Sequence, residues 1–191
     1  MDNTRTDISA FSHLAQPDLY ETQKSNAFKL VVTGLDPLTS PITGELIPNA
    51  SDKLKNAVFS FTPPSFSQEP ITVRVGNTVC KSAGTPTFND TTAGFHDYVG
   101  AEVYEVLYAW QSLSFNIKTG RTGLMSDYKK TAYVLEYNTD FSSLVRVWRL
   151  YGVWVNSLTK DPYDNSGNAQ EVKINCSLSY DWAEPEDPSQ F

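Results

Sequence analysis

Histidine and cysteine are scarce in this chain of 191 residues, which contains two of each. Neither His13 nor His96 has a second histidine or a cysteine at the spacing of metal ligands, so a zinc site is not expected. The sequence also lacks a phosphate-binding loop, a dinucleotide-binding glycine motif and a nucleophile elbow. It therefore predicts no metal, no cofactor and no catalytic activity.

Long apolar runs and basic clusters are missing as well. No stretch approaches about 18 consecutive apolar residues, and the N-terminus lacks the basic start and apolar core of a signal peptide. We therefore expect no membrane anchor and folding in the cytoplasm. With 15 basic and 22 acidic residues the net charge is −7, which argues against a surface that grips nucleic acid. It does not exclude DNA that passes close by without being held.

The two cysteines, Cys80 and Cys176, lie near the ends of two predicted strands. Cytoplasmic folding disfavours a disulfide, so we expect two reduced thiols that pack as small hydrophobic groups. A disulfide within or between chains is the less favoured alternative.

The chain does contain a series of apolar–polar alternations, which are typical of β-strands. They predict strands at 26–35, 57–67, 70–83, 129–138, 144–155 and 171–182. In the third of these, Ile71, Val73 and Val75 are expected to face inward. The last strand alternates most regularly, with an apolar face of Val172, Ile174, Cys176, Leu178, Tyr180 and Trp182 opposite a polar face of Lys173, Asn175, Ser177, Ser179 and Asp181.

The segments between these strands have weaker periodicity. An apolar stripe that includes Val103, Leu107 and Trp110 predicts a helix over 97–115, with Asp97 as its N-cap. We expect an arm at 1–26, a domain over 27–182 with loops at 36–56 and 85–98, and an acidic tail at 183–191. Together, the predicted strands and helix indicate a mainly β fold, a two-sheet antiparallel β-sandwich or partly closed barrel with one flanking α-helix.

One predicted strand, 144–155, is apolar on both faces, whereas a half-solvated strand alternates apolar with polar side chains. One face carries Leu144, Arg146, Trp148, Leu150, Gly152 and Trp154, and the other carries Val145, Val147, Arg149, Tyr151, Val153 and Val155. A subunit that closes a ring with copies of itself would bury both faces and pair its strand edges across subunits.

Three consecutive segments of the C-terminal half form a recognisable pattern: "AYVLEYN", "VRVWRLYGVWVNSL" followed by a "YDNSGN" turn, and "EVKINCSLSYDW". This pattern resembles the major tail tube protein of contractile-tailed bacteriophages, a family similar in fold to the Hcp tube of the type VI secretion system. Its aromatic-basic strand that ends in a glycine and an aromatic residue corresponds to Trp148, Arg149, Gly152 and Trp154. The resemblance covers roughly residues 70 to 182, with Val155 standing where the family often has proline.

The resemblance implies hexameric rings that stack into a tail tube, assembled in the host cytoplasm and incorporated into the virion. Such a tube conducts DNA during ejection and has the tail sheath, baseplate and tail-terminator proteins as partners. The residues expected at the subunit core or interface are Trp110, Trp148, Arg149, Tyr151, Gly152, Trp154 and Trp182. The candidates for the lumen lining, where small polar or acidic groups would let DNA slide, are Asn175, Ser177, Ser179 and Asp181.

Three other functions stay open. The chain could be a baseplate protein that initiates the tube instead of its repeating subunit. It could be a monomeric β-sandwich that binds carbohydrate, with Trp148, Trp154 or Trp182 as stacking platforms. An enzyme of unknown type is the third, although no group of residues points to one. The assembly state separates a tube protein from a binding module.

Overall fold

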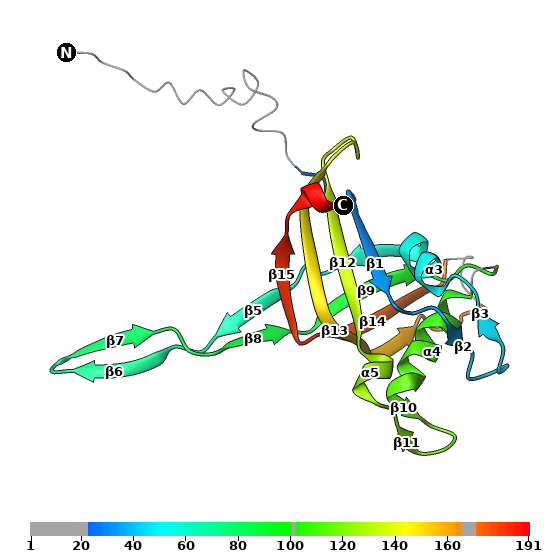
Figure 1. The fold of residues 1–191 in the computed structure, drawn as a ribbon, viewed down its shortest axis with the longest axis horizontal. Helices are drawn as coiled ribbons and strands as arrows, with labels where there is room; N and C mark the ends of the chain where they lie inside the picture. The colour runs from blue at the N-terminus through cyan, green and yellow to red at the C-terminus, as the bar shows by residue number, and fades with distance from the viewer. Residues whose placement is uncertain (1–22, 101, 166–170) are drawn as a thin grey trace, which may run out of the picture.

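The computed structural model describes residues 23–100, 102–165 and 171–191. Its main feature is a seven-stranded antiparallel sheet with the strand order β1-β12-β13-β14-β9-β4, to which β15 adds by pairing with β13 (Figure 1). The strands are β1 (Phe28–Thr33), β4 (Val58–Phe61), β9 (Thr91–His96), β12 (Lys130–Tyr137), β13 (Leu144–Lys160), β14 (Lys173–Ser179) and β15 (Trp182–Glu186). The expected mainly β fold is confirmed, although the sheet does not close on itself within the described ranges.

Strand β13 has 17 residues and joins the two halves of this sheet. Its first half pairs with β12 and β15, and its second half pairs with β14. The pairing register shifts by one residue between Leu150 and Val153 and again between Val155 and Ser157. These β-bulges bend the strand and turn the sheet onto itself.

The first bulge also changes which side chains share a face. Leu150 and Val153 both face the core, because the extra residue falls between them, at Gly152 with φ +67°. Trp148 packs against the core on the same side, whereas Trp154 lies on the opposite face. The expectation that Trp148 and Trp154 share one face is therefore wrong, since it assumed unbroken alternation.

The core lies between this bent sheet and helix α4 (Val103–Ser114), which packs against β13. Trp110 on α4 is 1% exposed, and its Nε1 donates a hydrogen bond to the carbonyl oxygen of Tyr128 at 2.8 Å. Other fully buried side chains of this core are Leu30, Phe95, Leu107, Leu150, Ile174 and Leu178. The predicted flanking helix is thus present, and Trp110 lies in the core beneath it.

Helix α4 begins later than expected. Its N-cap is Glu102, in the left-handed conformation at φ 49°, and no side chain caps it. Asp97 does not cap the helix, because its Oδ2 lies 2.6 Å from Nζ of Lys160 at the end of β13. This ion pair raises the pKa of Lys160 and joins the start of the α4 connection to the sheet.

Two segments expected to be loops contain regular structure. Residues 36–56 include the short strands β2 (Leu38–Thr39) and β3 (Leu46–Ile47) and most of helix α3 (Ala50–Ala57). Helix α3 buries only two alanines and Leu54, an apolar face too small to stand out in the sequence. Residues 85–98 include β8 (Pro86–Asn89) and the central strand β9, whose buried face combines Thr91, Ala93 and Phe95.

The C-terminal segment is not a tail. Trp182 does not continue β14 but begins β15, which pairs with β13 and is followed by the 3₁₀ turn η1 (Pro188–Gln190). The remaining short elements are β10 (Phe115–Asn116), β11 (Arg121–Thr122) and α5 (Met125–Tyr128). The predicted arm falls largely on residues 1–22, outside the described part of the chain. No helix within the described part is long and apolar enough to span a membrane.

Candidate assembly surfaces

A hairpin projects from the body of the molecule (Figure 1). Its inner ladder pairs β5 (Ser65–Gln68) with β8, and its outer ladder pairs β6 (Ile71–Val75) with β7 (Thr78–Ser82). A Gly76-Asn77 turn joins β6 and β7, with Gly76 in the left-handed conformation at φ +62°. Among the described residues, the two strands of the outer ladder pair only with each other.

The apolar side chains of this outer ladder are in solvent. Ile71, Val73 and Val75 are 55%, 50% and 57% exposed, so the expectation that they face inward is wrong. An isolated two-stranded hairpin is marginally stable in water, and an exposed group of large apolar side chains marks an interaction site. The hairpin therefore has the properties of a segment that another chain covers.

The base of the hairpin is fixed to the body. The hydroxyl of Tyr180 accepts from the backbone N–H of Ser65 and donates to its carbonyl oxygen, both at 3.2 Å. The Tyr180 ring also contacts the Phe88 ring at 5.9 Å, and burial raises the pKa of Tyr180. Between the two ladders, a Cβ on Gly84 would lie 2.1 Å from the carbonyl oxygen of Glu69, so this crossing requires glycine. These contacts fix the direction in which the hairpin projects.

A second surface is the polar face of β14, which holds most of the predicted lumen candidates. Asn175 is exposed, and Ser177 and Ser179 are partly exposed. The residues directly opposite Asn175 and Ser177 on the neighbouring strands are also small and uncharged: Ser157 and Thr159 on β13, and Thr92 and Gly94 on β9. This part of the sheet is therefore a surface of short neutral side chains.

Asp181 lies apart from that surface, beyond the end of β14. Its Oδ1 and Oδ2 accept hydrogen bonds from Nζ of Lys129 at 2.7 and 2.9 Å. A Cβ on Gly152 would lie 2.2 Å from Oδ2 of Asp181, so the carboxylate fills the space beside the β13 bulge. Asp181 therefore stabilises the bend of β13 through its bonds to Lys129 and its contact with Gly152.

Three predicted core or interface residues meet on the outer side of β13 and β15. Nη1 of Arg149 donates to Oε1 of Glu186 at 2.9 Å, and its guanidinium lies 4.5 Å from the Tyr151 ring. Tyr151 donates to Oε1 of Glu184 at 2.5 Å and stacks on Trp182 at 4.8 Å. These bonds raise the pKa of both Arg149 and Tyr151. The carboxylates of β15 were not identified from the sequence, because the segment was interpreted as a tail.

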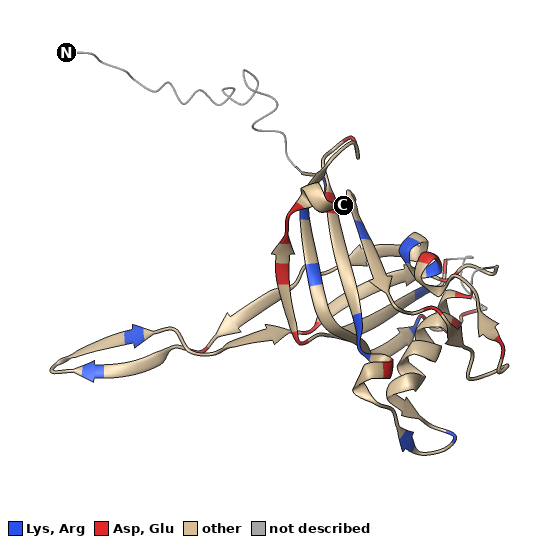
Figure 2. Ribbon diagram, viewed as in Figure 1, with Lys and Arg blue, Asp and Glu red and all other residues tan. Residues whose placement is uncertain are grey.

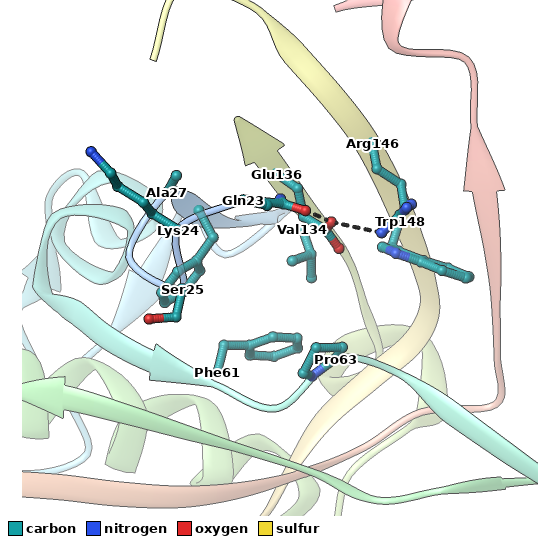
Figure 3. Close-up of a pocket in the computed structure, with 11 residues that line it drawn as sticks. Gln23, Lys24, Ser25, Ala27, Phe61, Pro63, Val134, Glu136, Arg146 and Trp148 are labelled. Atoms are coloured by element: carbon teal, nitrogen blue, oxygen red, sulfur yellow. Dashed lines mark hydrogen bonds and ion pairs between the residues drawn. The ribbon is translucent and has the colours of Figure 1, made fainter. Parts of the chain in front are cut away.

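An apolar pocket of about 470 Å³ opens between β1, β12 and β13 on one side and the end of β4 on the other (Figure 3). Its apolar lining comes from Phe28, Phe61, Pro63, Val134 and Trp148. At the rim, Oε2 of Glu136 accepts from Arg146 Nη1 at 3.0 Å and from Gln23 Nε2 at 3.3 Å. The pocket lies beside β1 and β4, the two strands that end the path of the sheet.

The described residues hold no group of three or more His, Cys, Asp or Glu side chains able to bind a metal ion. Cys80 and Cys176 are both free thiols, so the less favoured disulfide within the chain is not formed. Cys80 is exposed on the hairpin, whereas burial of Cys176 raises its pKa to about 12.

The fold is that of proteins from contractile injection systems. The chain is similar to a chain of the PVC sheath–tube complex, an extracellular contractile injection system in the extended state, with a TM-score of 0.62 and 17% identity over 90% of this chain and 96% of that one. It is also similar to the tube-terminating cap of the anti-feeding prophage, with a TM-score of 0.61 and 16% identity over 97% of this chain and 99% of that one.

A chain of the anti-feeding prophage baseplate has a TM-score of 0.59 at 12% identity, over 86% of this chain and 95% of that one. No protein-family model and no curated protein matches the sequence. Structures of Hcp proteins are also among the matches, with lower TM-scores of 0.43 and 0.45. The fold expected from the sequence is confirmed in that it is shared with chains of contractile injection systems.

Proposed function

We propose that the chain is a structural subunit that forms hexameric rings, and that these rings stack into the tube of a contractile tail. The observation that carries the proposal is the fold, which covers nearly the whole of a chain from an injection-system sheath–tube complex. The projecting hairpin supports it, because its exposed apolar side chains need a partner and a further copy of the chain supplies one. In this role the protein is not an enzyme.

The part of the polar β14 face from Asn175 to Ser179 is the proposed lining of the channel. Asn175 and Ser177 lie opposite small uncharged residues on β9 and β13, and Ser179 is uncharged as well, so this part of the face offers no positive charge to hold a phosphate backbone. Lys173, an exposed cation on the same face, stands at the start of β14 and lies over the Phe59 ring. Such a surface suits a conduit through which DNA slides during ejection. Asp181 is left out of this lining, because Lys129 neutralises it at the bend of β13.

The proposed partners are the other parts of the same particle: a sheath around the tube, a baseplate at one end and a terminator at the other. The support is that similar chains come from a sheath–tube complex, a baseplate and a tube-terminating cap. The proposed location is the virion tail, after assembly in the host cytoplasm.

A baseplate initiator is the second candidate, since a baseplate chain has the same fold. An initiator would form one ring and stop, whereas a tube subunit would polymerise. A carbohydrate-binding module would remain a monomer.

Negative-stain electron microscopy of the purified chain, at rising concentration, tests all three. Stacked rings or tubes support the tube subunit, single rings support the initiator, and a monomer at every concentration contradicts the proposal.

Gold labelling tests the channel lining. In a Cys80→Ser background, a maleimide–gold label on Asn175→Cys should lie on the axis of the tube. A label on Thr119→Cys, in the β10–β11 turn, should lie off the axis. Off-axis gold on Asn175→Cys would exclude this face as the lining.

A further inference from the structure

The body has a hollow at the end of the sheet where β9 ends and β14 begins. It measures about 560 Å³, and its rim combines apolar side chains with carboxylates. The apolar members include Ile42 and Val99, which are 64% and 103% exposed. The acidic members are Asp97, Glu102, Glu105 and Glu171. Among the residues described around the hollow, none that lines it is a lysine or arginine.

Within the described part of the chain, Asp97 is the one carboxylate of the four that forms an ion pair with a lysine or arginine. Asp97 is paired with Lys160, and Glu105 accepts a hydrogen bond from the hydroxyl of Ser40, which carries no charge. Glu171 lies 3.3 Å from Nδ1 of His96, and its side chain is 70% exposed. The hollow is therefore an apolar depression with a negative rim.

The outer ladder of the hairpin has the opposite character. Its residues from 71 to 82 contain two cations, Arg74 and Lys81, and no acid, as the colouring of Figure 2 shows. The register pairs Arg74 with Val79 and Thr72 with Lys81, which puts both cations on one face of the ladder. The other face carries Ile71, Val73 and Val75. The face with the two cations also carries Val79, which is 53% exposed, so it joins apolar surface to positive charge as the hollow joins apolar surface to negative charge.

The hairpin and the hollow lie at opposite ends of one pair of strands. Strand β9 begins at Thr91, just after the hairpin, and ends at His96, beside the hollow. The antiparallel strand β14 begins next to Glu171, and Tyr180, which follows it, fastens the hairpin base. Figure 1 shows the hairpin at one side of the molecule and α4 at the other. A hairpin cannot reach the hollow of its own chain, whereas the hairpin of a second copy can.

From this complementarity we infer that the β6–β7 hairpin of one copy docks in the acidic hollow of another, with Arg74 and Lys81 against Glu102 and Glu171. The contact joins two different surfaces of the same chain, so it repeats from copy to copy and builds closed rings or open stacks. The inference rests on the proposed tube function and names the contact that joins the copies. The occupant is a second copy because the chain itself carries the matching charges.

Charge reversal tests the contact in the full-length protein. Arg74→Glu with Lys81→Glu makes the hairpin acidic, and Glu102→Lys with Glu171→Lys makes the hollow basic. Each double variant alone should raise the critical concentration for assembly more than about tenfold, because like charges then meet. The matched control, Asp52→Lys with Asp127→Lys, reverses two exposed acids that do not line the hollow and should assemble like the wild type. Circular dichroism and melting curves confirm that each variant is folded.

Mixing the two double variants gives the sharper result. In the mixture each acidic hairpin finds a basic hollow and each basic hairpin finds an acidic hollow, so assembly should return. The quadruple variant, which carries both reversals in one chain, should assemble alone. Inactive variants that stay inactive when mixed, or reversals that leave assembly unchanged, overturn the inference.

A disulfide trap keeps the inference testable if the charge variants do not fold. In a Cys80→Ser background, Lys81→Cys with Glu102→Cys should give a ladder of covalent oligomers on oxidation. Lys81→Cys with Asp127→Cys should not. A ladder only in the second pair, or in neither, contradicts the docking.

These outcomes separate the inference from the proposed function. A wild-type chain that never assembles contradicts the tube function itself. A wild-type chain that assembles, with hollow variants that assemble equally well, leaves the tube intact and overturns only the docking site.

Discussion

The hairpin and strand β14 have similar patterns in the sequence and opposite positions in the structure. In β14, Ile174, Cys176 and Leu178 alternate with polar residues and are at most 2% exposed. In β6, Ile71, Val73 and Val75 alternate in the same way, yet each is at least 50% exposed. Alternation thus shows that one face of a strand is made to be buried, but not whether the burial takes place within the chain or against another chain.

The largest difference between the two regions should appear in the folding free energy. Trp110→Ala removes the largest fully buried side chain of the core together with its hydrogen bond to Tyr128. We expect a loss of about 3–5 kcal/mol in the free energy of unfolding, measured by urea denaturation. Trp182→Ala, at a position 48% exposed, is the control and should cost roughly 1 kcal/mol or less. Equal losses would mean that α4 does not close the core.

We expect the next largest loss of unfolding free energy from a substitution at the bend of β13. Gly152→Ala introduces a Cβ at φ +67° and against the Asp181 carboxylate, whereas Gly120→Ala introduces one at the same φ with no atom within 4 Å. The left-handed conformation alone costs about 1–2 kcal/mol. Gly152→Ala should therefore destabilise the protein more than Gly120→Ala in urea denaturation, and equal costs would show that Asp181 moves aside freely.

The junction between body and hairpin should be sensitive to a smaller change. Tyr180→Phe removes the hydroxyl that bonds both backbone groups of Ser65. We expect a loss of about 1 kcal/mol in unfolding free energy, because two polar groups lose their partner. Assembly should weaken as well, since the hairpin loses part of its anchor. Tyr137→Phe, at a ring that contacts Lys29 and Phe141, serves as the control. Unchanged stability and assembly would show that the Phe88 contact alone holds the hairpin.

Substitutions at the end of the hairpin should leave the monomer almost untouched. Val73→Ser with Val79→Ser changes two side chains that are 50% and 53% exposed, on opposite faces of the ladder. The free energy of unfolding should stay within about 0.5 kcal/mol of the wild type. Sedimentation should nevertheless show that assembly is lost. A destabilised monomer would mean that the hairpin packs on its own body.

The reactivity of the two cysteines compares the accessibility of the hairpin with that of β14, and it needs no substitution. Cys80 is exposed on the hairpin, whereas Cys176 is buried in β14 with its pKa raised to about 12, so little of its thiol is ionised at neutral pH. A thiol reagent should label one cysteine in the folded monomer and two after denaturation. In the assembled protein Cys80 should become protected. Rapid labelling of Cys176 would indicate that the β14–β9 ladder opens easily.

The sequence predicted the parts of the fold in which apolar side chains are large and regularly spaced. Strands β1, β12 and β14 and helix α4 all belong to this group. Strand β9 was missed because its buried face includes Thr91 and Ala93, which give a weak apolar signal. Its central position depends on pairing with β14 and β4, which are distant in sequence.

The candidate surfaces were harder to predict than the strands. The faces of β13 could not be derived from alternation, because the bulge at Gly152 exchanges them. The cluster around Arg149 depends on Glu184 and Glu186, which reach it only because β15 folds back onto β13. The signal for that return was present in the sequence as Trp182 followed by alternating acids, within a segment whose prolines suggested a tail.

The one-sided hairpin has a consequence for how an assembly grows. If each copy presents its hairpin on one side and its hollow on the other, a stack of copies is polar and its two ends differ chemically. One end offers a row of free basic hairpins, and the other offers a row of empty acidic hollows. A nucleus that supplies only one of these surfaces fixes the direction of growth, and a cap that covers only the other ends it. Length and direction then depend on which end each accessory protein recognises.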